Sequence, residues 1–224
     1  MMTGPKRWPL WTSVGVAAAG LLAAAFGMAL VAFGYSVHQT PSQAMNPTLE
    51  RGTSIITEKV RGDEVRRGDV VLVADPWDLR GMVVKRVIGI GGDRVACCPQ
   101  GGGVTLNGQP LSEPYLHEGS PNGGLPEYSA VVPAGRLFLL GDHRTDSLDS
   151  RMYQAADQGS VAASAVRERV VWHGGTDPEP LPGKLLGALA AIVGGGLLLV
   201  VGTIGAIVAA VIGARRRSRM PITV

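Results

Sequence analysis

The chain has 224 residues, 46% of them hydrophobic, and a formal net charge of +3. All 18 acidic residues and all but six of the 21 Lys and Arg residues lie between Glu50 and Lys184, so this central region is mildly acidic. It offers no basic face to neutralise phosphates, which excludes nucleic acid as a partner. The two cysteines, Cys97 and Cys98, are adjacent and lack the paired spacing of a zinc site. Two free thiols and a strained bridge between neighbours both fit the sequence.

Two long uncharged stretches stand on either side of this acidic region. Residues 9–35 and 185–214 contain no Asp, Glu, Lys or Arg. A bilayer core of roughly 30 Å requires about 20 apolar residues as a helix, which satisfies its own backbone hydrogen bonds in lipid. The first stretch is longer than the apolar core of about 7–15 residues in a cleavable signal peptide. Both stretches are therefore predicted to be transmembrane helices.

Basic residues flank the outer end of each predicted helix. Residues 1–8 contain one Lys and one Arg, and residues 215–224 contain four Arg. Because short basic flanks stay in the cytoplasm, both termini are predicted to be cytoplasmic and residues 36–176 to lie outside the cell membrane. The proline-rich residues 177–184 predict a stiff linker that returns the chain to the membrane.

Short β-branched runs separated by Gly and Pro fill the central region. They cover residues 54–57, 69–73, 82–90, 104–106, 131–132, 137–140 and 170–172. Asn107-Gly108, directly after the run at residues 104–106, predicts a tight hairpin turn. Several short strands joined by turns predict a mainly antiparallel β domain between the two helices. Residues 118–127, rich in Gly, Pro and Ser, predict a mobile loop.

Four segments of the central region resemble the sequence boxes of a known family. Residues 41–49 read PSQAMNPTL, residues 67–71 RGDVV, residues 85–93 KRVIGIGGD and residues 141–151 GDHRTDSLDSR. In this order, directly after a membrane anchor, they are similar to bacterial type I signal peptidases, also called leader peptidases. These are serine–lysine proteases, and the second anchor resembles the actinobacterial form. The resemblance implies a catalytic β-barrel or coiled sheet.

The resemblance assigns a lysine as the base of the reaction. It implies that Lys85 is the general base of a Ser/Lys dyad, and a lysine amine serves as a base only when burial keeps it neutral. On a strand, Lys85 shares a face with Val83 and Val87, while Arg86 points to the other face. The alternation therefore suits burial of Lys85.

The resemblance also assigns supporting roles. Ser42 is implied to donate its hydroxyl to the oxyanion beside the backbone N–H of residue 44. Ser147 is implied to hydrogen-bond the amine of Lys85. Asp149 and Arg151 are implied to form a supporting ion pair near the site. No cofactor and no metal ligand is implied.

The position of the nucleophile departs from the family pattern. The family has Ser where this chain has Ala44, and alanine has no hydroxyl with which to form an acyl-enzyme. An engineered Ser→Ala substitution and a naturally inactive relative both fit the sequence. A third explanation, that Ser42 replaces the nucleophile, ranks below them because residues two apart in an extended segment lie about 6–7 Å from each other.

The function implied by the resemblance is removal of signal peptides at a membrane surface. The enzyme would be a serine endopeptidase that cleaves secreted preproteins after small residues at positions −1 and −3, with the lipid bilayer as its second partner. With Ala44 the chain is expected to be inactive or severely impaired. The alternative is a non-catalytic protein that binds signal peptides or assists an active peptidase.

Overall fold

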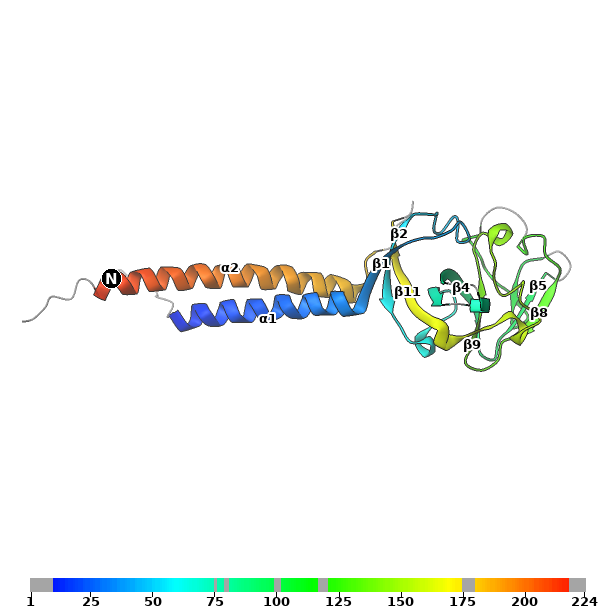
Figure 1. Cartoon of the computed structure of the whole chain (residues 1–224), viewed down its shortest axis with the longest axis horizontal. Helices are drawn as coiled ribbons and strands as arrows, with labels where there is room; N and C mark the ends of the chain where they lie inside the picture. The colour runs from blue at the N-terminus through cyan, green and yellow to red at the C-terminus, as the bar shows by residue number, and fades with distance from the viewer. Residues whose placement is uncertain are drawn as a thin grey trace, which may run out of the picture. The chain divides into compact units, whose positions relative to one another are not determined.

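A computed structural model describes residues 10–74, 76–78, 81–98, 102–116, 121–174 and 180–217. The chain divides into two compact units. One contains two long helices, α1 (Leu10–Gly34) and α2 (Gly183–Arg217), and the other spans Tyr35–Leu181. The expectation of a β domain with a long apolar helix on either side of it in the chain is confirmed (Figure 1).

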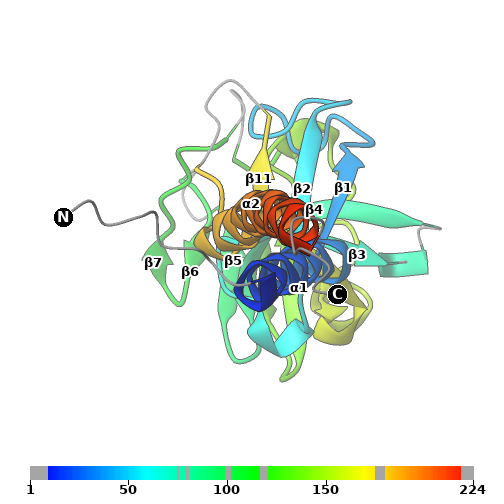
Figure 2. The same cartoon turned by 90° about the vertical axis from the view of Figure 1, so that its left-hand side faces the viewer.

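The helical unit consists of α1 and α2 lying side by side, as both views show (Figures 1 and 2). Both helices are long and apolar enough to cross a membrane, with mean hydropathy of 2.3 and 2.6 over their most apolar windows. Large apolar side chains such as Phe26, Phe33 and Leu197 are 63%, 77% and 64% exposed. A helix that presents such side chains outward matches the requirement of a lipid-facing surface.

Glycines allow the backbones of α1 and α2 to approach closely. A Cβ atom on Gly20 would lie 2.5 Å from the backbone N of Leu199, and one on Gly202 would lie 2.7 Å from Cα of Ala17. The order of these pairs along the chain makes the helices antiparallel. Small residues at such contacts are typical of helix association in membranes, where van der Waals packing replaces the hydrophobic effect.

The second unit contains a seven-stranded sheet and a four-stranded sheet, and every strand pair is antiparallel. The larger sheet has the order β1 (Tyr35–Gln39), β2 (Ser54–Lys59), β11 (Val166–His173), β3 (Val70–Ala74), β4 (Met82–Ile90), β9 (Arg136–Leu140) and β10 (Val161–Ala162). The smaller has the order β7 (Gln109–Pro110), β6 (Thr105–Leu106), β5 (Arg94–Cys97) and β8 (Tyr128–Val131).

Short 3-10 helices occupy several connections of this unit. They cover Gly62–Glu64, Pro76–Asp78, Arg144–Asp146, Asp157–Gly159 and Ala163–Ala165. The predicted hairpin turn is confirmed, because Asn107 and Gly108 join β6 to β7 with φ of 53° and 81°. These left-handed angles at both central residues are those of a type I′ turn, which favours Asn-Gly.

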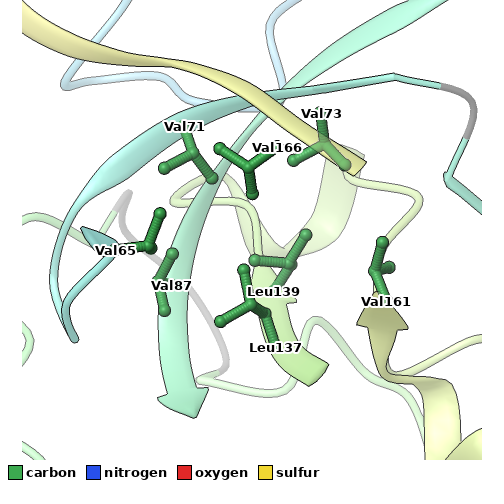
Figure 3. Close-up of a cluster of buried hydrophobic side chains, with 8 residues drawn as sticks. All are labelled: Val65, Val71, Val73, Val87, Leu137, Leu139, Val161 and Val166. Carbon is green, nitrogen blue, oxygen red and sulfur yellow. The ribbon is translucent and has the colours of Figure 1, made fainter. Parts of the chain in front are cut away.

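One hydrophobic core of this unit is formed largely by side chains from strands of the larger sheet (Figure 3). Val71 and Val73 of β3 and Leu137 and Leu139 of β9 are each 2% exposed or less. Their spacing of two residues places them on one face of the sheet. Burial of each such side chain stabilises the fold by about 1.5–3 kcal/mol. This core holds β4, which passes through the same cluster at Val87.

The structure decides the state of the two cysteines and shows one buried carboxylate with several polar partners in this unit. Cys97 and Cys98 form a disulfide at the end of β5, so the alternative of two free thiols is not the one observed. His38 of β1 forms an ion-pair contact of 2.7 Å with Glu168 of β11. Thr57 and Ser36 also donate hydrogen bonds to this carboxylate and contribute to a pKa of Glu168 below its usual value, against the opposing effect of burial.

Candidate active site

The segment after β1 folds back on itself and carries Ala44 into the interior. Ala44 is 5% exposed, and Met45 and Leu49 beside it are 1% and 0% exposed in a core cluster. The N–H of Leu49 donates to the carbonyl of Met45 at 2.8 Å, and that of Asn46 donates to Gln43 at 2.9 Å. Ser42 and Gln43 lie in a bend and Ala44 lies in a turn, so the extended geometry expected between residues 42 and 44 is wrong. Asn-Pro at residues 46 and 47 favours turns, and the turn hydrogen bonds prevail.

The alternation along β4 separates two cations as the sequence predicted. Lys85 is 4% exposed and faces the same cavity as Val83. Arg86 pairs instead with Asp142, through contacts of 2.8 Å to Oδ1 and 2.6 Å to Oδ2. Its guanidinium also lies 3.8 Å from the centre of the Tyr115 ring. The strand thus presents one basic side chain, Lys85, to the cavity and the next, Arg86, to a buried carboxylate.

A cavity of about 460 Å³ brings the predicted residues together. Ser42 and Ala44 line it from the segment after β1, and Lys85 lines it from β4. Ser147 and its neighbours line it from the fourth sequence box. Residues far apart in the sequence therefore meet at one cavity, whose volume lies within the usual range of about 300–1,000 Å³ for ligand sites.

Burial sets the electrostatics of Lys85. Removal from water lowers the pKa of its amine below the usual 10.5, while the negative charge of Asp149 acts in the opposite direction. Arg151 adds a further lowering effect. Because loss of hydration dominates, the neutral amine is favoured more than in water, and a neutral amine accepts a proton.

The two expected oxyanion donors are neighbours. The backbone N–H of Ala44 lies 3.4 Å from Oγ of Ser42, to which it donates a long hydrogen bond. The carbonyl of Ala44 accepts from the N–H of His143 at 3.1 Å, which fixes the peptide on the other side. A long bond of this kind is weak, so the N–H can turn to a substrate oxygen at little cost.

The expected hydrogen bond from Ser147 to Lys85 is not formed. Oγ of Ser147 is buried and has no hydrogen-bond partner among the residues that the structure describes. It packs against Gly141, where a Cβ atom would come within 2.5 Å of the Ala44 carbonyl oxygen and closer still to this hydroxyl. The missing side chain of Gly141 thus makes room for the Ser147 hydroxyl at the edge of the cavity.

The expected ion pair between Asp149 and Arg151 is present and buried. Arg151 Nε donates to Oδ1 at 2.7 Å and Nη2 donates to Oδ2 at 2.8 Å. Oδ2 of Asp149 also accepts from the N–H of Gly141 at 3.0 Å. The pair therefore supports the turn that holds Ser147 in place. The ion pair contacts the site through the backbone N–H of Gly141, and neither side chain lines the cavity.

Two further ion pairs at the site have no counterpart in the roles expected from the sequence. Arg144 pairs with Glu113, and both side chains are at most 4% exposed. Arg86 pairs with Asp142, to which no role was assigned, and Thr48 also donates to that carboxylate at 2.5 Å. In the sequence, these residues were visible only as opposite charges within the boxes and at Glu113. The sequence did not indicate which of these charges pair with each other.

Comparison with known proteins identifies the class. The family model for signal peptidase, peptidase S26, matches residues 12–173, so the chain belongs to this family. It is 36% identical over 139 residues to the signal peptidase I of Leptolyngbya laminosa, covering 56% of this chain and 64% of that one. The chain therefore spans less than two thirds of that relative's length.

Two more relatives extend the comparison. The signal peptidase I of Bacillus caldolyticus is 33% identical over 161 residues, which cover 66% of this chain and 81% of the relative. Among solved structures, a signal peptidase I from Enterococcus faecalis V583 has 27% sequence identity and a TM-score of 0.36. That match covers 46% of this chain and 93% of the other.

Proposed function

We propose that this chain has the scaffold of a membrane-bound signal peptidase I, a serine endopeptidase that removes signal peptides from secreted preproteins. The observation that carries the proposal is the buried amine of Lys85, with a lowered pKa, in the same cavity as residue 44. A serine at position 44 would be the nucleophile and Lys85 its general base. Its hydroxyl would attack the scissile carbonyl, and the proton would pass to the amine.

The other cavity groups take supporting roles in this proposal. The hydroxyl of Ser42 and the N–H of residue 44 stabilise the oxyanion, since preorganised donors favour the charge that develops on the carbonyl oxygen. Ser147 orients the amine of Lys85 once a substrate fills the cavity. Asp149 and Arg151 keep the surrounding turn in place. With Ala44, no acyl-enzyme forms, and loss of a serine nucleophile costs on the order of a millionfold in turnover.

The membrane arrangement is part of the same proposal. The spans expected at residues 9–35 and 185–214 cross the plasma membrane, with Tyr35 already belonging to β1, while residues 36–176 lie outside and both termini lie in the cytoplasm. Residues 177–184 act as the linker, whose last two residues, Gly183 and Lys184, already lie in α2. The substrates are preproteins with small residues at positions −1 and −3. Because β1 begins at Tyr35 directly after α1, only a short stretch of chain separates the membrane helix from Ser42.

A second candidate function rests on the same substitution. Ala44 removes the nucleophile but leaves its backbone N–H, the cavity and the buried lysine in place. Such a site retains the means to bind a signal peptide without cutting it. The chain would then be a non-catalytic binding protein or an accessory of an active peptidase.

The test compares the chain with its Ala44→Ser version in lipid vesicles containing a precursor with Ala at −1 and −3. Cleavage by the Ser version alone, abolished by adding Lys85→Met, supports the peptidase scaffold. If neither chain cleaves but both bind the precursor, the binding protein is the better description. Cleavage by the chain as it stands, lost on Ser42→Ala, would show that the nucleophile is assigned wrongly.

A further inference from the structure

The segment Pro121–Pro126 forms one side of the cavity. Gly123 and Leu125 line it together with Lys85 and residue 44. Within the segment, the side chain of Asn122 is 5% exposed and donates to the carbonyls of Leu125 at 2.6 Å and Pro126 at 2.8 Å. The turn is thus closed by a buried side chain. Of the loop expected at residues 118–127, residues 118–120 lie outside the residues that the structure describes.

Two buried arginines hold this segment against the site. Arg144 Nη1 donates to the carbonyl of Pro121 at 2.6 Å, and Arg151 Nη1 donates to that of Asn122 at 2.8 Å. Both arginines are buried, with 4% and 6% exposure. Gly123 has φ of +63°, and a Cβ atom there would collide with the carbonyl of Arg144. Charge-assisted bonds to a closely packed turn fix the place of Leu125 relative to the fourth box.

The chemistry of this side of the cavity is apolar. Leu125 is half-buried, and the neighbouring Leu148 and Met152 are 50% and 52% exposed while lining the same cavity. Large apolar side chains left open to solvent at a cavity mark a binding surface for apolar groups. Because Leu125 lines the same cavity as residue 44, a peptide bound with its scissile bond at residue 44 has room to place a side chain against Leu125.

We infer that Leu125 determines specificity: its side chain limits the size of the substrate side chain that the cavity admits beside the scissile bond. The inference rests on the proposed function, because it concerns the same cavity. The limit is steric, since the turn behind Leu125 is fixed by Asn122, Arg144 and Arg151 and cannot yield to a larger group. In apolar pockets one methylene changes discrimination by about 10–200-fold.

The test uses the Ala44→Ser chain in lipid vesicles and a panel of precursors. Each residue from −3 to +2 is changed, one at a time, from Ala to Leu and to Phe. Leu125→Ala is expected to raise kcat/KM at least about 10-fold for the precursors enlarged at one of these positions, and Leu125→Phe to lower it. The precursor with small residues throughout should change little. Leu111→Ala is the matched control, because Leu111 packs on a core cluster away from the cavity.

The inference is overturned if the ratio of kcat/KM for enlarged precursors to kcat/KM for the small precursor is unchanged in both Leu125 variants. It is also overturned if Leu111→Ala changes this ratio equally. An Ala44→Ser chain that cuts no precursor defeats the proposed function instead. In that case, binding of the same precursors to the chain with Ala44 decides the matter. Tighter binding of the enlarged precursor by Leu125→Ala than by the parent supports the inference, and equal binding refutes it.

Discussion

Replacement of Lys85 by methionine is expected to make the folded protein more stable. Lys85 is 4% exposed, and loss of hydration lowers the pKa of its amine. A lowered pKa means that the folded state disfavours the charged amine, and each pKa unit corresponds to about 1.4 kcal/mol. Methionine keeps an unbranched apolar chain in the same space and removes the amine. Lys85→Met should raise the free energy of unfolding by about 1–3 kcal/mol, a gain of several degrees in melting temperature.

The pH dependence of this gain has a definite sign. Burial lowers the pKa of Lys85 below 10.5, whereas the unfolded chain keeps the usual value. Between the folded pKa and 10.5 the unfolded state binds more protons, so the stability of the parent rises with pH through this window. Below the folded pKa the parent carries the full cost of the buried charge. The advantage of Lys85→Met should therefore be largest below the folded pKa of Lys85 and shrink as the pH rises toward 10.5.

The assay is thermal unfolding of the full chain in detergent, followed by circular dichroism, at several pH values from neutral to alkaline. Lys59→Met is the matched control, because Lys59 lies exposed at the end of β2. It should change the melting temperature little and leave its pH dependence as in the parent. The reasoning is refuted if Lys85→Met melts at or below the parent temperature and shows the same dependence on pH.

Three further substitutions test the supports of the fold and of the site. Asp149→Asn leaves its arginine partner buried without a counter-ion and should cost about 3–5 kcal/mol in urea unfolding. Gly141→Ala should cost about 1–3 kcal/mol through overpacking, whereas Gly103→Ala, with open space around it, should stay within about 0.5 kcal/mol in the same assay. Gly20→Leu should lower the melting temperature of the chain in detergent through overpacking against α2, while Gly15→Leu, which meets nothing within 4 Å, should change it little.

Periodicity in the sequence was enough to predict most of the larger strands and one face of the site, but not β1, β5, β7 or β10. The spacing of two along β4 correctly separated buried Lys85 from Arg86, because side chains alternate on any strand. The Asn107-Gly108 turn was equally local, since its left-handed angles depend on those two residues. Both features follow from neighbours in the chain, which is why no knowledge of the tertiary fold was needed.

Pairings between distant residues could not be predicted in the same way. Glu113 and Arg144 lie 31 residues apart and meet only because of the order of strands between them. Likewise, the turn at residue 44 replaces an expected extended segment, because hydrogen bonds within the turn outweigh the local preference. The hydroxyl of Ser147 packs against Gly141, and this contact is possible only because glycine has no side chain.

The surroundings of residue 44 predict that a serine is tolerated at this position without any other change. Its N–H and carbonyl are held by Ser42 and His143, contacts that do not involve the side chain. Ala44 lines the cavity, so a hydroxyl added to its side chain can be accommodated beside it. The amine of Lys85, whose pKa is lowered by burial, lines the same cavity. Under the proposed function, Ala44→Ser alone is therefore expected to confer cleavage, with no second substitution.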